Sequence, residues 1–474
     1  MGIDGFHTAT KSNLEPKHLS SYANQRIGID ASAWLHRGTV MYSYEILTET
    51  EPWKAASASA SASASASASA SGSTPPWIDY PLRLLALLEN NNITPVVVFD
   101  GVSSPAKAPT SAKRRERKEA ARAKGMELLA RGDEAAARKV LMGAFEVTPA
   151  MTSELIVELK RRKVEFVVAP YEADAQLAWM ASVGAIQGII TEDSDLFAYG
   201  CTQPILFKLS PSGTVEELTM SRVLADDTNG DLRGWSVEEL RALCVLSGCD
   251  FLPSIRGMGF KTVLKVMTKF GTRSGPETLE RTLAQLRKMD RWKEGASDAY
   301  CAAAARAVEA FSHGLVYDVE RRVCVYINAD AMREVGDGED VDLTHLGPRL
   351  VRGEAGLLER VCRGEVCGRT FEEIKSPGQT GPLAVAFGLV KQKEKEKEKE
   401  KKGGIFSFVY DQDGSGKAES KGVATGNRKE NAGANEGLRA VVSPEKKKRK
   451  GAMHKFIEFW RPAGTSTANE RRAE

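Results

Sequence analysis

The stretch "GIITEDSDLFAYG", residues 188–200, places three acids within four positions of an apolar run. Glu192, Asp193 and Asp195 lie between two pairs of large apolar residues, in a segment that otherwise favours burial. Gathering carboxylates there costs free energy, because each anion repels its neighbours and loses hydration. The stretch therefore predicts a buried strand that ends at a site where cations offset the repulsion.

Three other segments share this design, since each is a short β-branched or apolar run that ends in acids. They are "RIGID" (26–30), "PVVVFD" (95–100) and "VEFVVAPYEAD" (164–174), beside "GAIQGIITEDSD" (184–195). Helical patterns alternate with them, in "PLRLLALLEN", "MTSELIVELKRR" and "EADAQLAWMASV". The alternation predicts an α/β fold with a mostly parallel twisted sheet flanked by helices.

Sites in such a sheet form outside the carboxyl ends of the strands, where these acids fall. The candidates are Asp30, Asp100, Glu172, Asp174, Asp193 and Asp195. Any one of them alone is explained as a helix N-cap or a first-turn acid. Four strands with the same ending instead indicate a cation site, and oxygen ligands without clustered His or Cys favour Mg²⁺ or Mn²⁺ over zinc.

Six or seven acids are enough for two Mg²⁺ ions, some of them bound through water, which is the arrangement of phosphodiester hydrolysis. A haloacid-dehalogenase-type phosphatase needs an Asp two residues after its first strand Asp. Ala31 and Ser32 follow Asp30, so that reading fails.

Two further constellations indicate contact with phosphates. "CVLSGCDFLPSIRGMGFKTVLKVMTKFG" (244–271) predicts two helices joined by a Gly-x-Gly turn, with Asp250 upstream and Lys261 and Lys265 downstream. Backbone N–H groups at such a turn can bind phosphate, although a plain helical hairpin is the alternative. "KAPTSAKRRERKEAARAKG" (107–125) is a basic helical pattern directly after Asp100, which favours backbone-phosphate contact over a merely solvated charged face.

Composition bounds the remaining possibilities. The net charge of +3 says little about partners, and the 7 cysteines form no C-x-x-C pair. No apolar run approaches the roughly 20 residues that span a bilayer. Without a signal peptide pattern we expect a soluble intracellular protein with reduced thiols and no membrane partner.

Two segments offer a core little to bury. Residues 57–71 alternate Ser and Ala, which predicts a flexible surface insertion. The tail from about Ser376 holds Lys-Glu alternation, a Gly/Ser/Asn-rich stretch and the basic run "EKKKRK" (445–450), which predict disorder.

The chain resembles the Rad2/XPG flap-nuclease superfamily, and within it the exonuclease 1 branch. The resemblance lies in "MGIDG", "GIDASAWLHRG", "VVVFDG", "APYEADAQLA", "GIITEDSDLFAYGC" and "LSGCDFLPSIRGMG", in this order between Met1 and about Ile374. It implies a PIN-like nuclease core with a helical arch and a helix-two-turn-helix DNA clamp. The implied regions are 1–105 (N-terminal nuclease region, with an insertion at 55–74), 106–148 (arch), 149–225 (internal nuclease region), 226–375 (clamp and C-terminal helical part) and 376–474 (disordered tail).

The resemblance also implies the activity and the residues that perform it. The activity is a 5′→3′ double-stranded DNA exonuclease with 5′ flap endonuclease activity, acting on a 5′ end, nick or flap in mismatch repair, recombination and end resection. The metal ligands would be the six acids above with Asp250. Glu172 and Asp174 would hold one Mg²⁺ and Asp193 and Asp195 the other. Lys107 and Arg114 match arch residues that contact the scissile phosphate, and His36 matches a residue packed against DNA.

The hairpin matches a clamp that grips the uncut duplex through a potassium ion. Its K⁺ ligands would be Ser247 through the hydroxyl and Ser254 and Met258 through their carbonyls, with Gly257, Gly259 and Lys261 at the DNA. Glu192 has no ligand role in the matched motif.

Three departures from the family pattern bear on these expectations. Ser32 replaces an aromatic residue beside His36, which leaves DNA stacking there without its usual ring. Pro105 and Pro109 lie early in the arch and are expected to delay its helix start. The tail is short for the exonuclease 1 branch, which puts family contacts with mismatch-repair proteins in question.

The tail carries two short signals. "EKKKRK" matches a nuclear localisation signal and so predicts a nuclear protein, against mere solubilising charge. "MHKFIEFW" (453–460) has the spacing of a sliding-clamp-binding box from Met453 to Trp460, although Met453 replaces the usual Gln.

Three alternatives stay open. One is a flap or junction endonuclease of the same superfamily, which differs by substrate. Another is a catalytically silent DNA-binding scaffold, against which the complete set of acids argues. The third is a ribonuclease with a related acid-lined sheet, which would lack the downstream clamp.

Overall fold

The computed structural model describes residues 2–48, 76–225, 232–270, 277–327 and 355–374. All of them belong to one compact unit. The Ser-Ala insertion, the basic run at 445–450 and the segment 453–460 lie outside the described residues, so the predictions for them stay predictions.

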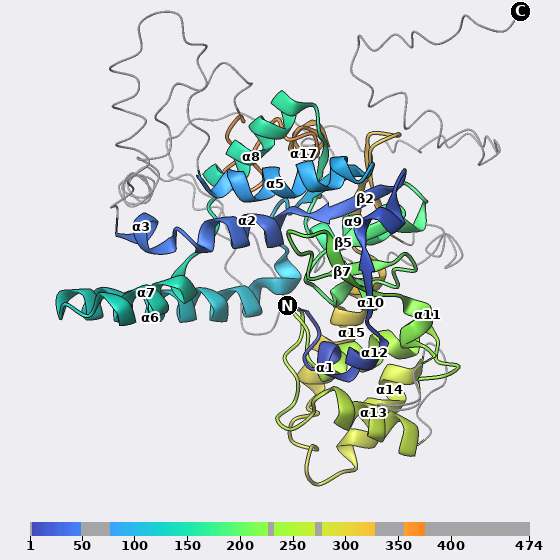
Figure 1. Ribbon diagram of the computed structural model, residues 1–474. Coiled ribbons are helices and arrows are strands. Elements are labelled where there is room, and N and C mark those ends of the chain that lie inside the picture. The colour runs from blue at the N-terminus through green and yellow to red at the C-terminus, as the bar shows by residue number, and fades with distance from the viewer. Residues whose placement is uncertain (1, 49–75, 226–231, 271–276, 328–354, 375–474) are drawn as a thin grey trace, which may run out of the picture. The chain divides into compact units, whose positions relative to one another are not determined.

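A seven-stranded sheet with the order β1-β7-β6-β5-β2-β3-β4 organises this unit (Figure 1). The five strands from β6 to β4 run parallel, and β7 and β1 add antiparallel pairs at one edge. This confirms the predicted α/β fold with a mostly parallel sheet. The strands are β1 Glu15–His18, β2 Arg26–Asp30, β3 Thr94–Phe99, β4 Glu165–Val168, β5 Gly188–Ile190, β6 Ile205–Phe207 and β7 Thr214–Leu218.

The central strands are buried on both faces, which explains their continuous apolar sequences. In β3 the side chains of Val96 and Val98 pack with Leu177 and Met180 of helix α9 (Ala173–Ser182). Gly28 of β2 lets α9 approach closely, because a Cβ there would lie 2.6 Å from the Leu177 side chain. Helices therefore fix the sheet edge at which the strands end.

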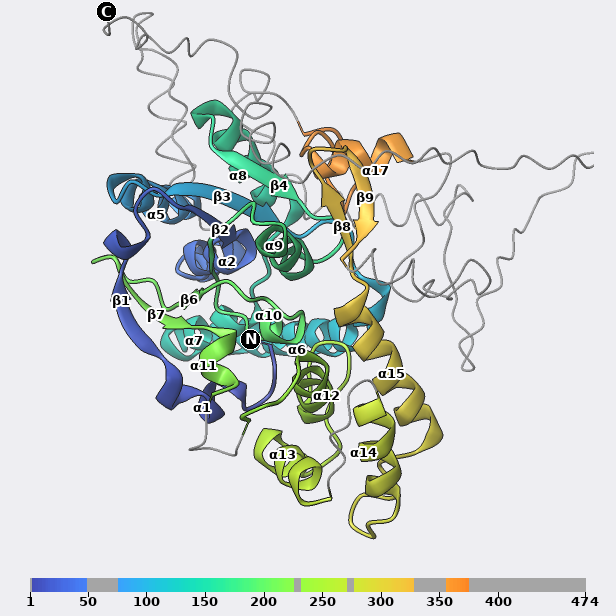
Figure 2. The ribbon, with the colours of Figure 1, turned by 90° about the vertical axis from the view of Figure 1, so that its right-hand side faces the viewer.

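The other helices around the sheet begin close to the predicted patterns. Helices α2 and α5 pack against each other and against β3, and α8 packs against β4 (Figure 2). Short helical elements complete this part of the chain. The bounds are α1 Phe6–Ala9, η1 Lys11–Asn13, η2 Leu19–Tyr22, α2 Ala31–Val40, α3 Ser43–Leu47, α5 Pro76–Asn90, α8 Pro149–Arg162, α10 Asp195–Ala198 and α11 Met220–Val223.

A helical hairpin follows β3 and extends away from the sheet (Figure 1). It consists of the 3-10 turn η3 (Pro105–Lys107), α6 (Ala108–Ala130) and α7 (Glu134–Ala144). The expected delay of the helix holds for Pro105, which lies in η3, but it is wrong for Pro109. Helix α6 already begins at Ala108, since a proline in the first turn lacks only an N–H that has no intrahelical partner.

The second half of the unit is mainly helical. Helix α12 starts at a capping box between Ser236 and Glu239 and ends before Gly248, whose φ of 108° favours glycine. Its loop leads into α13, as the Gly-x-Gly pattern predicted. The bounds are α12 Val237–Ser247, α13 Phe260–Lys269, α14 Thr278–Arg287, α15 Asp298–Ser312, β8 Leu315–Asp318, β9 Val323–Tyr326 and α17 Ala355–Cys362.

The helices can also be compared with the length and hydropathy that a membrane-spanning helix needs. Within the described part of the chain no single helix is long and apolar enough to cross a bilayer, and one bent pair, α7 with α8, meets the criterion by length and composition alone.

Gly101 provides a test of the packing beside β3. A Cβ at Gly101 would lie 1.9 Å from the Ala169 carbonyl oxygen, which is backbone and cannot move aside easily. We expect Gly101→Ala to lower the free energy of unfolding by about 1–3 kcal/mol or more, measured by urea denaturation. The matched control is Gly143→Ala on α7, where a Cβ meets open space and should stabilise the helix by about 0.5–1 kcal/mol. Equal effects at the two positions would contradict this packing.

Candidate active site

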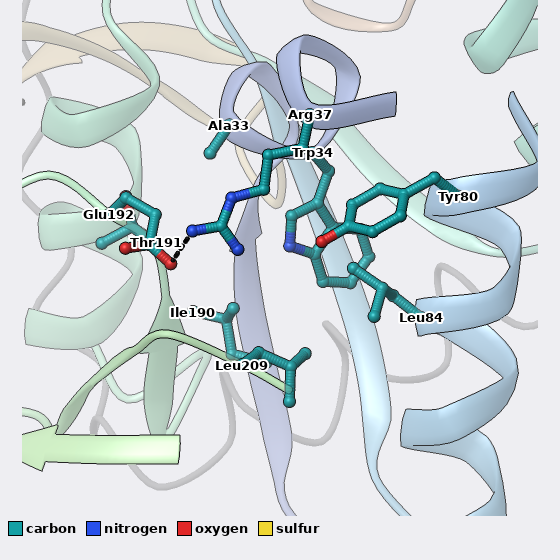
Figure 3. Close-up of a pocket in the computed structure, with 9 residues that line it drawn as sticks. All are labelled: Ala33, Trp34, Arg37, Tyr80, Leu84, Ile190, Thr191, Glu192 and Leu209. Carbon is teal, nitrogen blue, oxygen red and sulfur yellow. Dashed lines mark ion pairs between the residues drawn. The ribbon is translucent and has the colours of Figure 1, made fainter. Parts of the chain in front are cut away.

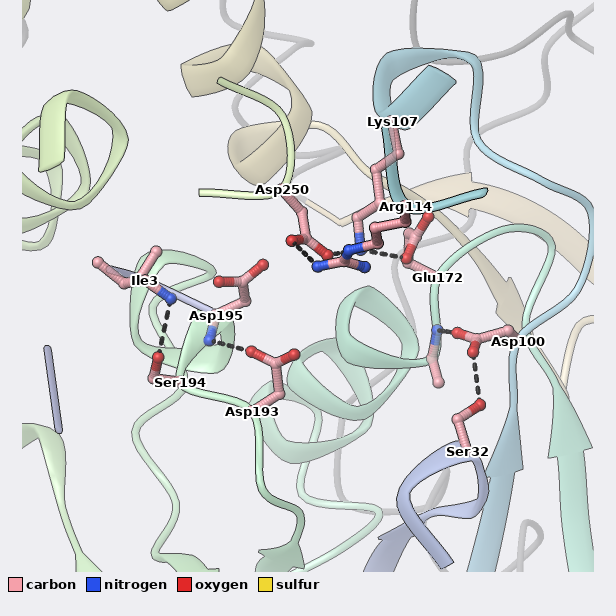
Figure 4. Close-up of polar contacts among 11 residues, drawn as sticks. Ile3, Ser32, Asp100, Lys107, Arg114, Glu172, Asp193, Ser194, Asp195 and Asp250 are labelled. Carbon is pink, nitrogen blue, oxygen red and sulfur yellow. Dashed lines mark hydrogen bonds and ion pairs between the residues drawn. The ribbon is translucent and has the colours of Figure 1, made fainter. Parts of the chain in front are cut away.

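The carboxyl ends of four parallel strands carry the predicted acids to one edge of the sheet (Figure 4). Asp30 ends β2, Asp100 follows β3, and Asp193 and Asp195 follow β5, whereas Glu172 and Asp174 begin helix α9 after β4. The side chains of Asp30, Asp174, Asp193, Asp195 and Asp250 are all at least nine-tenths buried. The sheet thus brings together acids that are more than 160 residues apart in the chain.

Two of these carboxylates already have protein donors. Asp30 caps α2 by accepting a hydrogen bond from the Ser32 backbone N–H at 2.9 Å. Asp100 accepts from the Ser32 hydroxyl at 2.6 Å and from the Ala173 N–H at 2.9 Å. The helix-capping interpretation is therefore right for Asp30. The sequence comparison noted Ser32 only because it replaces an aromatic residue, but in the structure its hydroxyl orients Asp100. Capping and a place at the site are compatible because each carboxylate oxygen can accept more than one contact.

The turn 191–195 is fixed by its own polar groups. Thr191 donates its hydroxyl to Asp30 Oδ2 at 3.0 Å and accepts from the Asp193 N–H at 3.1 Å. The Asp195 N–H donates to Asp193 Oδ1 at 2.9 Å. Sequence reasoning assigned no role to Thr191, although its hydroxyl directly follows the strand and precedes the acids.

Glu192 points toward Arg37 of helix α2 (Figure 3). Its carboxylate pairs with Arg37 of α2 at 2.8 Å and accepts from the Lys208 N–H at 3.0 Å, in a small pocket that Tyr80 also lines. Glu192 therefore ties the turn to α2 and to the segment after β6.

The N-terminal segment is a part of the site that sequence reasoning missed. Ile3 N–H donates to the Ser194 hydroxyl at 2.9 Å, and Asp4 N–H donates to the Gly248 carbonyl at 2.9 Å. Gly2 has a φ of 94°, and a Cβ there would lie 2.2 Å from Asp193 Oδ1. The glycine after Met1 was the available signal, because only glycine fits a left-handed residue against a carboxylate.

Crowding and burial shift the acids toward their protonated forms. Burial, together with the charges of Asp100 and Asp193, raises the pKa of Asp30 to about 7. Burial, followed by the charge of Asp193, raises the pKa of both Asp174 and Asp195 well above the usual range. Asp174 Oδ1 and Asp195 Oδ1 are moreover buried without any hydrogen-bond partner, which leaves two acceptors that a cation would satisfy.

Two cations of the helical hairpin reach the acids from the other side (Figure 4). Lys107 Nζ lies 2.5 Å from Glu172 and 3.4 Å from Asp250, and Arg114 lies 2.5 Å from the other Asp250 oxygen. Burial alone would lower the pKa of Lys107, but Glu172, Asp250 and Asp174 raise it well above its usual value. The predicted phosphate contacts thus lie against carboxylates in this structure.

The residues fit a hard divalent cation. Among the described residues, no three His, Cys, Asp or Glu side chains already surround one point as ready ligands. The Lys107 ammonium instead lies between Glu172 and Asp250, where it offsets their charge as a metal would. The donor set is carboxylate oxygen, and one oxygen each of Asp174 and Asp195 is buried without a hydrogen-bond donor, which is chemistry suited to Mg²⁺ or Mn²⁺.

The predicted clamp residues surround the α12–α13 loop. Ser247 is buried and donates its hydroxyl to the Leu243 carbonyl at 2.6 Å, which leaves the oxygen lone pairs available. Gly257 has a φ of 84°, Gly259 precedes α13, and Lys261 lies in its first turn. The potassium assignment to Ser247, Ser254 and Met258 stays a prediction, as does DNA contact by His36, which is exposed on α2.

Two models of known protein families match the two parts of the chain that carry the acids. Residues 1–121 match the XPG N-terminal domain, and residues 163–250 match the XPG I-region. These two segments contain all seven predicted acids together with Lys107 and Arg114.

Several relatives share the same stretch of sequence. The chain is 32% identical to exonuclease 1 of Danio rerio over 69% of this chain and 37% of the relative. It is 30% identical to exonuclease 1 of Arabidopsis thaliana over 81% of this chain and 47% of the relative. The chain therefore spans less than half the length of these relatives. Among solved structures, the catalytic core of Rad2 in complex with DNA substrate covers 67% of this chain and 82% of that chain, with 21% identity and a TM-score of 0.41.

The raised pKa values predict a pH-dependent stability of the metal-free protein. Between the ordinary value of 3.8 and about 7, folded Asp30 binds a proton that the unfolded chain does not. The free energy of unfolding should therefore fall as the pH rises through this window, by up to about 1.4 kcal/mol per pH unit for each such proton. Urea denaturation in EDTA between these limits measures the slope.

Asp30→Asn and added Mg²⁺ are the controls for this slope. The substitution removes the titrating group and should flatten the dependence, whereas Mg²⁺ should restore stability at the upper end of the window by binding the folded state. A metal-free protein that becomes more stable as the pH rises through the window would contradict the crowding described above.

Proposed function

This chain belongs to the exonuclease 1 branch of the Rad2/XPG nuclease superfamily, and from that premise we propose that it is a metal-dependent 5′→3′ exonuclease on duplex DNA that also cuts 5′ flaps. The observation that carries the proposal is the buried cluster of carboxylates at one sheet edge, with unpartnered oxygens on Asp174 and Asp195. Acids in this density serve no evident packing purpose, and their repulsion calls for divalent ions.

Two Mg²⁺ ions are proposed as the cofactors, with Mn²⁺ as an alternative. Glu172 and Asp174 would hold one ion and Asp193 and Asp195 the other, while Asp30, Asp100 and Asp250 act through water or bridge. The ions, when bound, supply a water nucleophile and stabilise the leaving oxygen of a phosphodiester.

The chain's own residues position the DNA. Lys107 and Arg114 are held beside the acids by ion pairs with Glu172 and Asp250, and a scissile phosphate offers them an equivalent anionic partner. Once paired with the phosphate, they would neutralise charge that develops in the transition state. The hairpin α6–α7 thus carries two cations to the point where the backbone is cut.

The α12–α13 loop is the proposed contact with the uncut duplex. Backbone N–H groups near Gly257 and Gly259 and the ammonium of Lys261 would bind phosphates, with K⁺ held by Ser247, Ser254 and Met258. His36 on α2 would pack against the DNA near the cut. These contacts grip the backbone and carry no sequence specificity.

The cellular assignment rests on the same branch. We propose action in mismatch repair, recombination and end resection in the nucleus, with the basic run at 445–450 as the localisation signal and 453–460 as a sliding-clamp contact. Both segments are outside the described residues.

A single experiment separates the proposed function from its alternatives. Duplexes labelled at the 5′ or the 3′ end are incubated with the chain and Mg²⁺. Release of mononucleotides from the 5′ end supports the exonuclease. Cleavage confined to flapped or four-way substrates would make the protein an endonuclease of the same superfamily, and binding without cleavage would make it a DNA-binding scaffold.

Asp195→Ala is expected to abolish cleavage while duplex binding persists. The substitution removes a buried carboxylate whose Oδ1 has no protein partner, whereas the arch and clamp contacts remain. Single-turnover cleavage, gel-shift affinity and Mg²⁺ binding by calorimetry are compared with Asp79→Ala, an exposed acid on α5. Undiminished turnover in Asp195→Ala would exclude it as a ligand.

Lys107→Ala should slow cleavage far more than it weakens duplex binding, by about 10²-fold or more in single-turnover rate, because its ammonium acts at the scissile phosphate. Lys113→Ala, an exposed cation on the adjoining helix α6, is the matched control. A proportional loss of rate and affinity in Lys107→Ala would identify Lys107 as a general phosphate contact instead.

A further inference from the structure

The Lys107 ammonium has an aromatic contact in addition to its two carboxylates. Its nitrogen lies 5.3 Å from the centre of the Phe251 ring. Phe251 packs edge-to-face on Phe311, with ring centres 4.9 Å apart, and Phe311 packs edge-to-face on Tyr199 at the same separation. We call these three rings, Phe251, Phe311 and Tyr199, the aromatic column.

The aromatic column joins parts of the chain that are far apart in sequence. Phe251 directly follows Asp250 in the α12–α13 loop, Phe311 is fully buried near the end of α15, and Tyr199 directly follows α10, the helix that Asp195 begins. Ala106, the neighbour of Lys107 in η3, packs in the same small cluster as Phe251. The base of the arch, the clamp loop and the acid turn therefore meet at these rings.

The column has the chemistry to hold a cation in one place. A lysine side chain has a flexible four-carbon stem, and ion pairs to two carboxylates still allow it several rotamers. A ring face attracts an ammonium more strongly where little water reaches it, and the Lys107 side chain is only 15% exposed. Phe251 is only half-buried by itself, so its position at the cation is not explained by core packing alone.

Tyr199 supports the column from the acid side. Its side chain is 7% exposed, and its hydroxyl interacts electrostatically with Lys107, Glu172, Asp174 and Asp195. Burial raises the pKa of this hydroxyl well above its usual value, so Tyr199 stays neutral and adds no charge to the crowded acids. The aromatic column therefore ends in an uncharged ring, which packs on Phe311 and adds no negative charge beside the acids.

We propose that the aromatic column makes Phe251 a positioning residue, which holds the Lys107 ammonium at the point between Glu172 and Asp250 from which it reaches the scissile phosphate. The inference deepens the proposed function and rests on it for the role of Lys107. Phe311 and Tyr199 act one step further away by fixing the Phe251 ring against the acid turn.

The test compares Phe251→Leu with Phe251→Tyr. Leucine keeps an apolar side chain but removes the ring face, whereas tyrosine retains the face. Phe251→Leu is expected to lower the single-turnover cleavage rate about tenfold, which corresponds to about 1.4 kcal/mol, with unchanged duplex affinity. Phe251→Tyr should keep the rate within about twofold of wild type, a difference of about 0.4 kcal/mol.

A double-mutant cycle separates positioning from general packing. In a Lys107→Ala background, Phe251→Leu should have no further effect on rate, because the cation that the ring holds is gone. A wild-type rate in Phe251→Leu, or losses that multiply in the double variant, would overturn the proposal. Thermal unfolding of each variant identifies any loss that comes from misfolding.

Reductive methylation followed by mass spectrometry gives a readout that needs neither metal nor DNA. Lys107 should react faster in Phe251→Leu than in wild type, by about threefold or more if the ring restrains it. Lys269, whose ammonium lies 5.2 Å from the Phe270 ring, is the internal reference and should not change. Unchanged Lys107 reactivity contradicts the column. A wild-type chain that fails to cleave DNA contradicts the proposed function instead, and leaves this measurement valid.

Discussion

Mutual repulsion among buried carboxylates is the constraint on which the rest of this structure depends. Parallel strands that end together deliver Asp30, Asp174, Asp193 and Asp195 to one sheet edge, where burial denies them water. Their raised pKa values follow from that placement. Protons or cations must offset the repulsion in such a cluster, so the fold favours the binding of positive charge at this edge of the sheet.

One neighbouring element supplies positive charge to the acids, and others fix the position of the turn that carries them. Lys107 and Arg114 bring charge from the arch to Glu172 and Asp250. The N-terminal segment joins Ser194 to Gly248, and Arg37 fixes Glu192. The helical hairpin and the α12–α13 loop thus meet at Asp250, and the N-terminal segment binds Ser194 and Gly248 beside the acids, so a change in any one of these elements is expected to affect the site.

Local sequence patterns predicted much of this arrangement because they are set by short-range physics. Short continuous β-branched runs favour buried strands, and their alternation with helices predicts a mostly parallel sheet whose carboxyl ends lie at one edge. That reasoning located six of the acids without any contact information. It failed at Pro109, where position within the first turn, and not residue type, decides whether a helix can begin.

The sequence by itself determined the fold class, the acidic edge and the family to which the chain belongs, since these depend on periodicity, strand endings and ordered motifs. Only the tertiary structure decided which groups face the acids. Three contacts join residues that are remote in the chain. They are the Lys107 ammonium between Glu172 and Asp250, the close approach of Gly2 to Asp193, and the edge-to-face packing of Phe251, Phe311 and Tyr199. No local pattern encodes such contacts, because they arise when separate elements pack against one another.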